Sequence, residues 1–151
     1  MQQTELNGRH ECSLDDRSRL AIPAKMRWAF PHGAVIAPWF DPCLIVVPRH
    51  RWAEKLAEIF GGEINPLDDD QRRLRRFIVG SLADQESLDK QGRVLIPATL
   101  RQRADLEGKV SVIGQVDYLE LWNPGRLDAD YEQMDSEGVS NIGRRLVERG
   151  R

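Results

Sequence analysis

Two blocks of sequence decide the fold: Leu14–Arg27, which reads LDDRSRLAIPAKMR, and Leu88–Arg101, which reads LDKQGRVLIPATLR. The second block begins 74 residues after the first, and the two agree at 7 of 14 positions without a gap. Chance seldom produces such agreement in one ungapped stretch. Each block contains the pattern Asp-x-x-x-Arg, at Asp15–Arg19 and at Asp89–Arg93. The chain is therefore predicted to hold two copies of one unit.

Each block predicts a hairpin followed by a short helix. Turn-forming residues separate two short runs, and the Ile-Pro pair ends the second run because the residue before proline is driven to extended backbone. Proline also suits the first residue of a helix. The predicted hairpin strands are His10–Leu14, Arg19–Ile22, Gln85–Leu88 and Arg93–Ile96, and the predicted helices are Pro23–Phe30 and Pro97–Ala104. Two more strands should follow in each copy, at Val35–Ala37 and Leu44–Val47, and at Val110–Ile113 and Leu119–Trp122.

Longer helices are predicted outside the blocks. The first spans Trp52–Phe60 and is stopped by Gly61-Gly62. The second should begin with Asn65 as its N-cap and Pro66 in its first turn. Its apolar face is expected to consist of Leu67, Leu74, Phe77 and Ile78. The third should begin near Asn123-Pro124 and direct inward Leu127, Tyr131 and Met134.

Composition and charge narrow the function classes. Apolar residues make up 40% and charged residues 30% of the chain, as in an ordinary globular protein. The net charge of −2 argues against a simple basic nucleic-acid binder, because affinity for DNA comes largely from neutralising phosphates. An oligomer can still gather several local basic patches on one face. The polar start Met1–His10 lacks the apolar core of a signal peptide, so we expect a cytoplasmic protein.

No motif predicts catalysis, a metal or a cofactor. Cys12 and Cys43 have no metal-ligand spacing and are expected to be reduced thiols, and the three histidines are scattered. There is no glycine-rich phosphate loop and no nucleophile motif. The carboxylates of Asp15-Asp16 are adjacent in a turn and cannot face each other across a substrate. The acidic run Asp68–Asp70 is explained by the preference of a helix start for negative charge.

The two blocks resemble the signature of the MraZ family, which has the form LDxKGRxxIPxxLR. The likeness extends from about Gly8 to Met134. It implies an α+β fold of the AbrB-like swapped-hairpin class, in which two pseudo-symmetric ββαβ repeats form a small β-barrel-like core with flanking helices. The implied boundaries are 8–60 for the first repeat, 61–81 for a linker helix, 82–134 for the second repeat and 135–151 for a polar, loosely helical tail.

The resemblance also implies a function. MraZ proteins are bacterial transcriptional regulators of the division and cell-wall gene cluster, commonly of their own promoter, and they bind short direct repeats in double-stranded DNA as oligomeric rings. A nucleoid-associated homo-oligomer is therefore expected. The sequence departs from the pattern at Ser18, where glycine is usual, and at Arg17 and Gln91, where lysine is usual.

The same match assigns roles to single residues. Arg19 and Arg93 are expected to contact guanine or phosphate, because the guanidinium group suits both. Asp15 and Asp89 would hold the arginines or the turn in place. Further contacts to phosphate are expected from Arg17, Lys90, Lys25 and Arg27. The alternative interpretations are an Asp–Arg ion pair that only fixes the hairpin, and solvated helix charge for Lys25 and Arg27.

Two other functions are compatible with such a fold. An antitoxin-like protein of the AbrB fold would bind a partner protein through an added segment, and the stretch after Asp135 could be that segment. Antitoxins of this class usually carry one copy of the unit, whereas this chain carries two. A purely structural ring protein is a third possibility.

Overall fold

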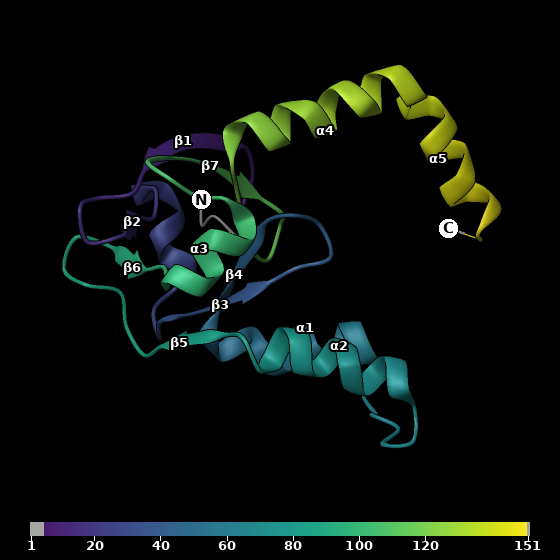
Figure 1. Cartoon of the computed structure of the whole chain (residues 1–151), viewed down its shortest axis with the longest axis horizontal. Helices are drawn as coiled ribbons and strands as arrows, with labels where there is room; N and C mark the ends of the chain where they lie inside the picture. The colour runs from purple at the N-terminus through teal and green to yellow at the C-terminus, as the bar shows by residue number, and fades with distance from the viewer. Residues whose placement is uncertain (1–4, 151) are drawn as a thin grey trace.

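Strands and helices alternate along the chain in a computed structural model that describes residues 5–150 (Figure 1). The first half contains β1 (Arg9–Ser13), β2 (Arg19–Ala21), the 3-10 helix η1 (Ala24–Ala29), β3 (Ala34–Pro38), β4 (Leu44–Pro48), the 3-10 helix η2 (Arg49–Arg51) and α1 (Trp52–Phe60). Helix α2 (Asp69–Val79) connects the halves. The second half contains β5 (Ala83–Gln85), β6 (Arg93–Leu95), α3 (Ala98–Ala104), β7 (Lys109–Gly114), β8 (Leu119–Trp122), α4 (Pro124–Glu137) and α5 (Val139–Glu148).

The main sheet interleaves the two halves of the chain. Its order is β1-β7-β8-β4-β3-β5, and every pairing is antiparallel. Strand β1 therefore lies beside a strand of the second half, while β5 lies beside a strand of the first half. This order is symmetric. If each strand β1–β4 is swapped with its counterpart in β5–β8, the list read from the opposite edge is unchanged. The centre is the pair β4 and β8, where Ile45 lies opposite Glu120.

Strands β2 and β6 form a separate two-stranded ribbon that covers one face of this sheet. Leu20 lies opposite Val94 in the ribbon, and both side chains are fully buried. They pack in one core cluster with Val46 of β4 and Leu119 of β8. Burial of such side chains stabilises the fold by about 1.5–3 kcal/mol each. The core therefore fixes the ribbon, and with it the two turns that precede β2 and β6.

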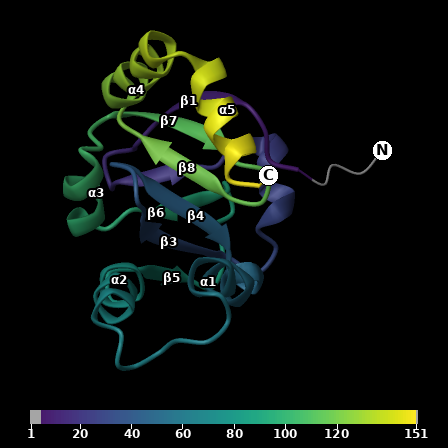
Figure 2. The same ribbon diagram turned by 90° about the vertical axis from the view of Figure 1, so that its right-hand side faces the viewer.

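Helices cover the other face of the sheet unevenly. Helices α1 and α2 pack over β4 through a cluster that contains Ile45, Val47 and Ile78. Helix α4 packs over the neighbouring β8 through Trp122 and Leu127. In Figure 2 the strands β7, β8, β4 and β3 follow one another, with α4 beyond one end and α1 and α2 beyond the other. Helix α5 buries no residue.

Several predicted element boundaries were wrong by a few residues. Pro23 and Pro97 precede their helices rather than begin them, because both keep extended backbone, with ψ of 135° and 151°. The first of these helices is a 3-10 helix and the second an α-helix. The strand expected at Gln85–Leu88 lies earlier, at Ala83–Gln85, where it pairs with β3.

The start of α2 is a further correction. The N-cap is Asp68, whose side chain accepts a hydrogen bond from the Gln71 backbone N–H, and not Asn65. Asn65 instead accepts from the Leu67 N–H in the preceding turn. Leu67 is consequently outside the helix and 88% exposed, so it is not part of the apolar face. Tyr131, expected to point inward from α4, is also exposed.

The third long helix begins where the sequence predicted. Asn123 is the N-cap of α4, and its side chain accepts hydrogen bonds from the N–H groups of Gly125 and Arg126. The helix continues to Glu137, beyond Asp135. A separate helix, α5, then fills most of the segment that was expected to be frayed or loosely helical.

Candidate nucleic-acid interface

The two Asp-x-x-x-Arg turns have the same local geometry. Asp15 Oδ1 accepts hydrogen bonds from the backbone N–H groups of Arg17 and Arg19, both at 2.9 Å. Asp89 Oδ1 accepts from the N–H groups of Gln91 and Arg93, also at 2.9 Å. Each carboxylate thus takes the place of a backbone acceptor and closes its own turn. This explains why the pattern requires a short acidic residue four positions before the arginine.

The fourth residue of each turn has left-handed backbone. Ser18 has a φ of 61° and Gly92 a φ of 72°. Glycine adopts this conformation without steric cost, whereas a serine does not. Ser18, which stands where the signature has glycine, nevertheless adopts the same left-handed conformation as Gly92.

The side chains of the two turns meet in one cluster of four charges. Arg19 Nε lies 2.8 Å from Asp15 Oδ2, and Arg93 Nε lies 2.7 Å from Asp89 Oδ2. Each arginine also reaches across to the other turn. Arg93 Nη1 lies 3.4 Å from Asp15 Oδ2, and Arg19 Nη1 lies 4.0 Å from Asp89 Oδ2. The two turns therefore form one site.

The carboxylates are held in their charged form. Hydrogen bonds from the Arg19 backbone, followed by those from the Arg17 backbone and the Arg19 side chain, hold the pKa of Asp15 below its ordinary value. Hydrogen bonds from the backbone and then the side chain of Arg93 lower the pKa of Asp89 in the same way. The cluster of two carboxylates and two guanidinium groups is formally neutral. Any positive field at this site must therefore come from residues around it.

Two further arginines brace the turns, one from each following helix. Arg27 Nε donates a hydrogen bond to the Ile22 carbonyl at 2.8 Å, and its side chain lies against Gly92 of the other half. Arg101 donates from Nη1 to the Ser18 hydroxyl, again across the halves. The sequence predicts only a surface role for Arg27 and no role for Arg101. Their common position, at the end of both blocks, was the available signal.

The remaining predicted contact residues are exposed around the cluster. Arg17 and Lys90 lie on the two turns, and Lys25 lies on η1. Within residues 5–150, none of the three side chains forms a salt bridge. Arg19 and Arg93 are about one quarter exposed, at 27% and 25%. The structure therefore brings Arg19 and Arg93 together on the exposed face of the ribbon, with Arg17 and Lys90 on the turns beside them.

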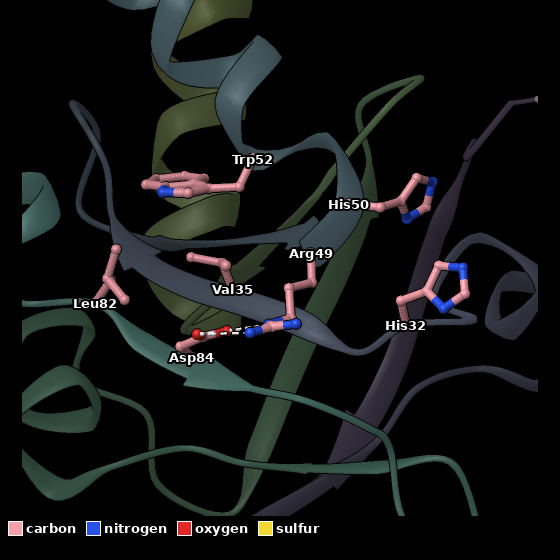
Figure 3. Close-up of a pocket in the computed structure, with 7 residues that line it drawn as sticks. All are labelled: His32, Val35, Arg49, His50, Trp52, Leu82 and Asp84. Atoms are coloured by element: carbon pink, nitrogen blue, oxygen red, sulfur yellow. Dashed lines mark hydrogen bonds and ion pairs between the residues drawn. The ribbon is translucent and has the colours of Figure 1, made fainter.

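A hollow of about 600 Å³ lies elsewhere, near the start of β3 and the end of β4 (Figure 3). Arg49 projects into it and pairs with Asp84, with Nε 2.7 Å from Oδ1 and Nη2 3.4 Å from Oδ2. The rings of His32 and His50 lie side by side at 5.6 Å, edge to face. Because Arg49 is already paired with Asp84, its guanidinium group is not free to bind an anionic ligand here.

Residues 5–150 contain neither a candidate metal cluster nor a helix that could span a membrane. No group of three or more His, Cys, Asp or Glu side chains is arranged to hold a metal ion there. In the same range no helix is long and apolar enough to cross a bilayer.

Comparison with known proteins identifies close relatives over nearly the whole chain. A family model described as "MraZ protein, putative antitoxin-like" matches residues 81–150. A protein of Roseiflexus castenholzii named Transcriptional regulator MraZ is 37% identical over 141 residues, which cover 93% of this chain and 96% of that protein. A protein of the same name from Lactiplantibacillus plantarum is 37% identical over 135 residues, which cover 89% and 91%. Another, from Thermomicrobium roseum, is 37% identical over 93% of the chain and 96% of its own length.

Proposed function

The chain belongs to the MraZ family of transcriptional regulators, and we propose that it acts by binding double-stranded DNA through the cluster of Asp15, Arg19, Asp89 and Arg93. Membership of a family of regulators agrees with the expectation that the chain is not an enzyme. The observation that carries the proposal is that the side chains of both Asp-x-x-x-Arg turns meet on the exposed face of the β2–β6 ribbon.

The arginines keep donors available for DNA. The Nε atoms of Arg19 and Arg93 are committed to carboxylates, and their Nη1 atoms reach across the cluster. Within residues 5–150 the Nη2 atoms form no hydrogen bond. Those groups can donate to guanine O6 or N7 or to phosphate oxygens. The carboxylates fix the orientation of both guanidinium planes beforehand, so less conformational entropy is lost when DNA binds.

The exposed cations around the cluster would supply affinity. Arg17 and Lys90 flank it on the turns, and Lys25 stands on the adjoining η1. Arg27 acts mainly as a brace, since its Nε is bonded to the Ile22 carbonyl. A net charge of −2 leaves one chain with a weak positive field, so several copies must act together. We propose a homo-oligomeric ring that presents several clusters to short direct repeats in the promoter of its own division and cell-wall gene cluster.

The fold is proposed to consist of two AbrB-like repeats. The symmetric strand order and the equivalent turns support repeats at about 8–60 and 82–134, a linker at 61–81 and a tail from 135. The ribbon and the sheet enclose the core between them, which agrees with a barrel-like arrangement. Location at the nucleoid follows from the DNA-binding proposal.

A second candidate function is that of an antitoxin-like protein, which the description of the matching family model favours. That function would use a partner protein rather than DNA, and the exposed surface of α5 is the segment available for it. The two functions predict different sensitive surfaces. Mutations in the cluster of Asp15, Arg19, Asp89 and Arg93 should impair DNA binding, whereas mutations in α5 should impair binding of a partner protein.

The test is a gel shift with the promoter region of the protein's own operon, at several salt concentrations. We expect Arg19→Ala to abolish binding while the oligomer stays intact, and Arg93→Ala to weaken it. Arg73→Ala is the matched control, because Arg73 is an exposed cation on α2, which packs on the face of the sheet opposite the ribbon. Unchanged binding by Arg19→Ala would overturn the site, and wild type that binds no such DNA at low salt would favour the antitoxin-like function.

A further inference from the structure

Leu95 lies on the same face of the β2–β6 ribbon as the charged cluster. Side chains alternate between the two faces of a strand, and the middle residue of each ribbon strand is buried. The first and third residues of both strands therefore share the outer face, which holds Arg19, Ala21, Arg93 and Leu95. Leu95 is 50% exposed. In Figure 1 the ribbon lies on the left of the molecule, whereas α2 and α5 lie on the right.

The two apolar residues of this face differ in size, and each has an arginine as its partner. In the register of the ribbon Leu95 is opposite Arg19, and Ala21 is opposite Arg93. Side chains that are directly opposite in an antiparallel pair are close neighbours, with Cβ atoms about 5 Å apart. The pair of Arg19 and Leu95 therefore combines a hydrogen-bond donor with a large apolar group. The pair of Arg93 and Ala21 combines a donor with a single methyl group.

The backbone of Leu95 is held by the side-chain amide of Gln85. The Leu95 N–H donates to Gln85 Oε1 at 3.1 Å, and the Leu95 carbonyl accepts from Gln85 Nε2. The amide thus occupies the outer edge of β6 at this residue, where another strand could otherwise pair. Exposure of Leu95 is consequently not a sign of an open strand edge. The amide also fixes the position from which the Leu95 side chain projects.

A face of this composition matches base edges better than it matches phosphates. A two-stranded β-ribbon fits the major groove of B-DNA, where guanine presents the acceptors O6 and N7 and thymine presents its C5-methyl group. Arginine donors suit the guanine acceptors, and an apolar side chain suits the methyl group. A contact with the phosphate backbone alone would make no use of Leu95, because phosphate oxygens bind cations and hydrogen-bond donors.

We propose that Leu95 contacts the methyl group of a thymine in the major groove, next to the base that Arg19 contacts. Leu95 then helps to select the sequence to which the protein binds. Ala21 extends less far from the ribbon, so the two halves of the face select different bases although their turns are alike. The inference rests on the proposed function, because it adds a specificity-determining residue to the same DNA-binding face.

The test removes the methyl group from the DNA and leaves its charge and base pairing unchanged. The promoter region of the protein's own operon is amplified with either thymidine or deoxyuridine triphosphate, and the affinity for each duplex is measured by gel shift at one salt concentration. We expect wild type to bind the uracil duplex more weakly, by about fourfold for each methyl contact, which is the factor for burial of one such group. Leu95→Ala should bind both duplexes with nearly equal affinity.

Two further variants serve as controls. Leu95→Met keeps an apolar side chain of similar volume and should preserve the preference for the thymine duplex. Val79→Ala shortens an exposed apolar residue on α2 and should preserve it as well. Because each variant is compared on two duplexes, a change in its stability affects both affinities alike and leaves their ratio unchanged.

The outcomes separate this inference from the proposed function. Equal binding of both duplexes by wild type overturns the role of Leu95, and so does a Leu95→Ala variant that keeps the wild-type preference. In both cases DNA binding itself stands. A wild type that binds neither duplex at low salt overturns the proposed function, and the role of Leu95 falls with it.

Discussion

The first and second turns reach the same geometry with different residues. Asp15 and Asp89 each close a turn with two backbone hydrogen bonds of 2.9 Å, yet the left-handed position is Ser18 in one turn and Gly92 in the other. The side chains packed against the two left-handed residues differ to match. The Ser18 hydroxyl accepts a bond from Arg101, while the bare Cα of Gly92 makes room for the Arg27 side chain. The arginine that braces each turn therefore sets which side chain the turn can hold.

The largest effect is expected from removing the shared carboxylates. Asp15→Ala leaves the N–H groups of Arg17 and Arg19 without their acceptor, and Asp89→Ala does the same in the second turn. Each variant should lower the Tm and abolish DNA binding. Because Arg93 contacts both carboxylates, the double variant should lose less stability than the sum of the single variants. Simple additivity would mean that the two turns are independent.

The stability that Asp15→Ala or Asp89→Ala removes should depend on pH in a known direction. The pKa of each carboxyl is lower in the folded chain than its ordinary value of about 3.9, so the stabilisation is present above that value. It is lost as the pH falls through the folded pKa. The difference in Tm between wild type and Asp15→Ala, measured by circular dichroism, should therefore be large at neutral pH and shrink in acid. A difference that is constant with pH would assign the loss to packing.

The next effect comes from exchanging the left-handed residues. Gly92→Ser places a Cβ within 2.2–2.7 Å of Arg27 side-chain atoms and adds backbone strain of about 1–2 kcal/mol. We expect a clearly lower Tm. Ser18→Gly relieves the same strain but loses the bond from Arg101, so its net change should be smaller than that of Gly92→Ser. Equal destabilisation by both variants would contradict the assigned roles of Arg27 and Arg101.

A smaller effect is expected at the centre of the sheet, where the halves differ again. Ile45 of β4 faces Glu120 of β8, and burial raises the pKa of the Glu120 carboxyl despite a 2.9 Å hydrogen bond from Trp122 Nε1. A raised folded pKa contributes stability at low pH that is lost as the pH rises through it. Glu120→Gln should therefore raise the Tm at neutral pH and change it little near pH 4.

The smallest effect is expected in the salt dependence of DNA binding. Arg17 and Gln91 occupy equivalent positions in the two turns, and only Arg17 is charged. Gln91→Lys should steepen the slope of log affinity against log salt by about 0.9 for each added phosphate contact, and Arg17→Gln should flatten it similarly. Filter binding over a salt series measures both slopes. If neither slope changes, this position does not contact phosphate.

Much of the local structure could be predicted because it depends on neighbouring residues. The Trp52–Phe60 helix and the Asn123 cap agree with their predictions, since apolar spacing and capping act within one or two turns. The predicted start of α2 was wrong because Asn65 and Asp68 are both good N-cap residues. The choice between them depends on how Leu74, Phe77 and Ile78 pack over the sheet. The candidate site was located by its repeat, but the bracing role of Arg101 required contact across the halves.

The sequence by itself determined the two hairpin turns, the residues that close them and the family of the chain, because all three depend on residues that are contiguous in the sequence. Only the tertiary structure decided that Arg93 reaches Asp15 and that β1 pairs with β7. Those contacts join residues far apart in the chain, and burial of Leu20, Val94 and their neighbours in one core brings them together.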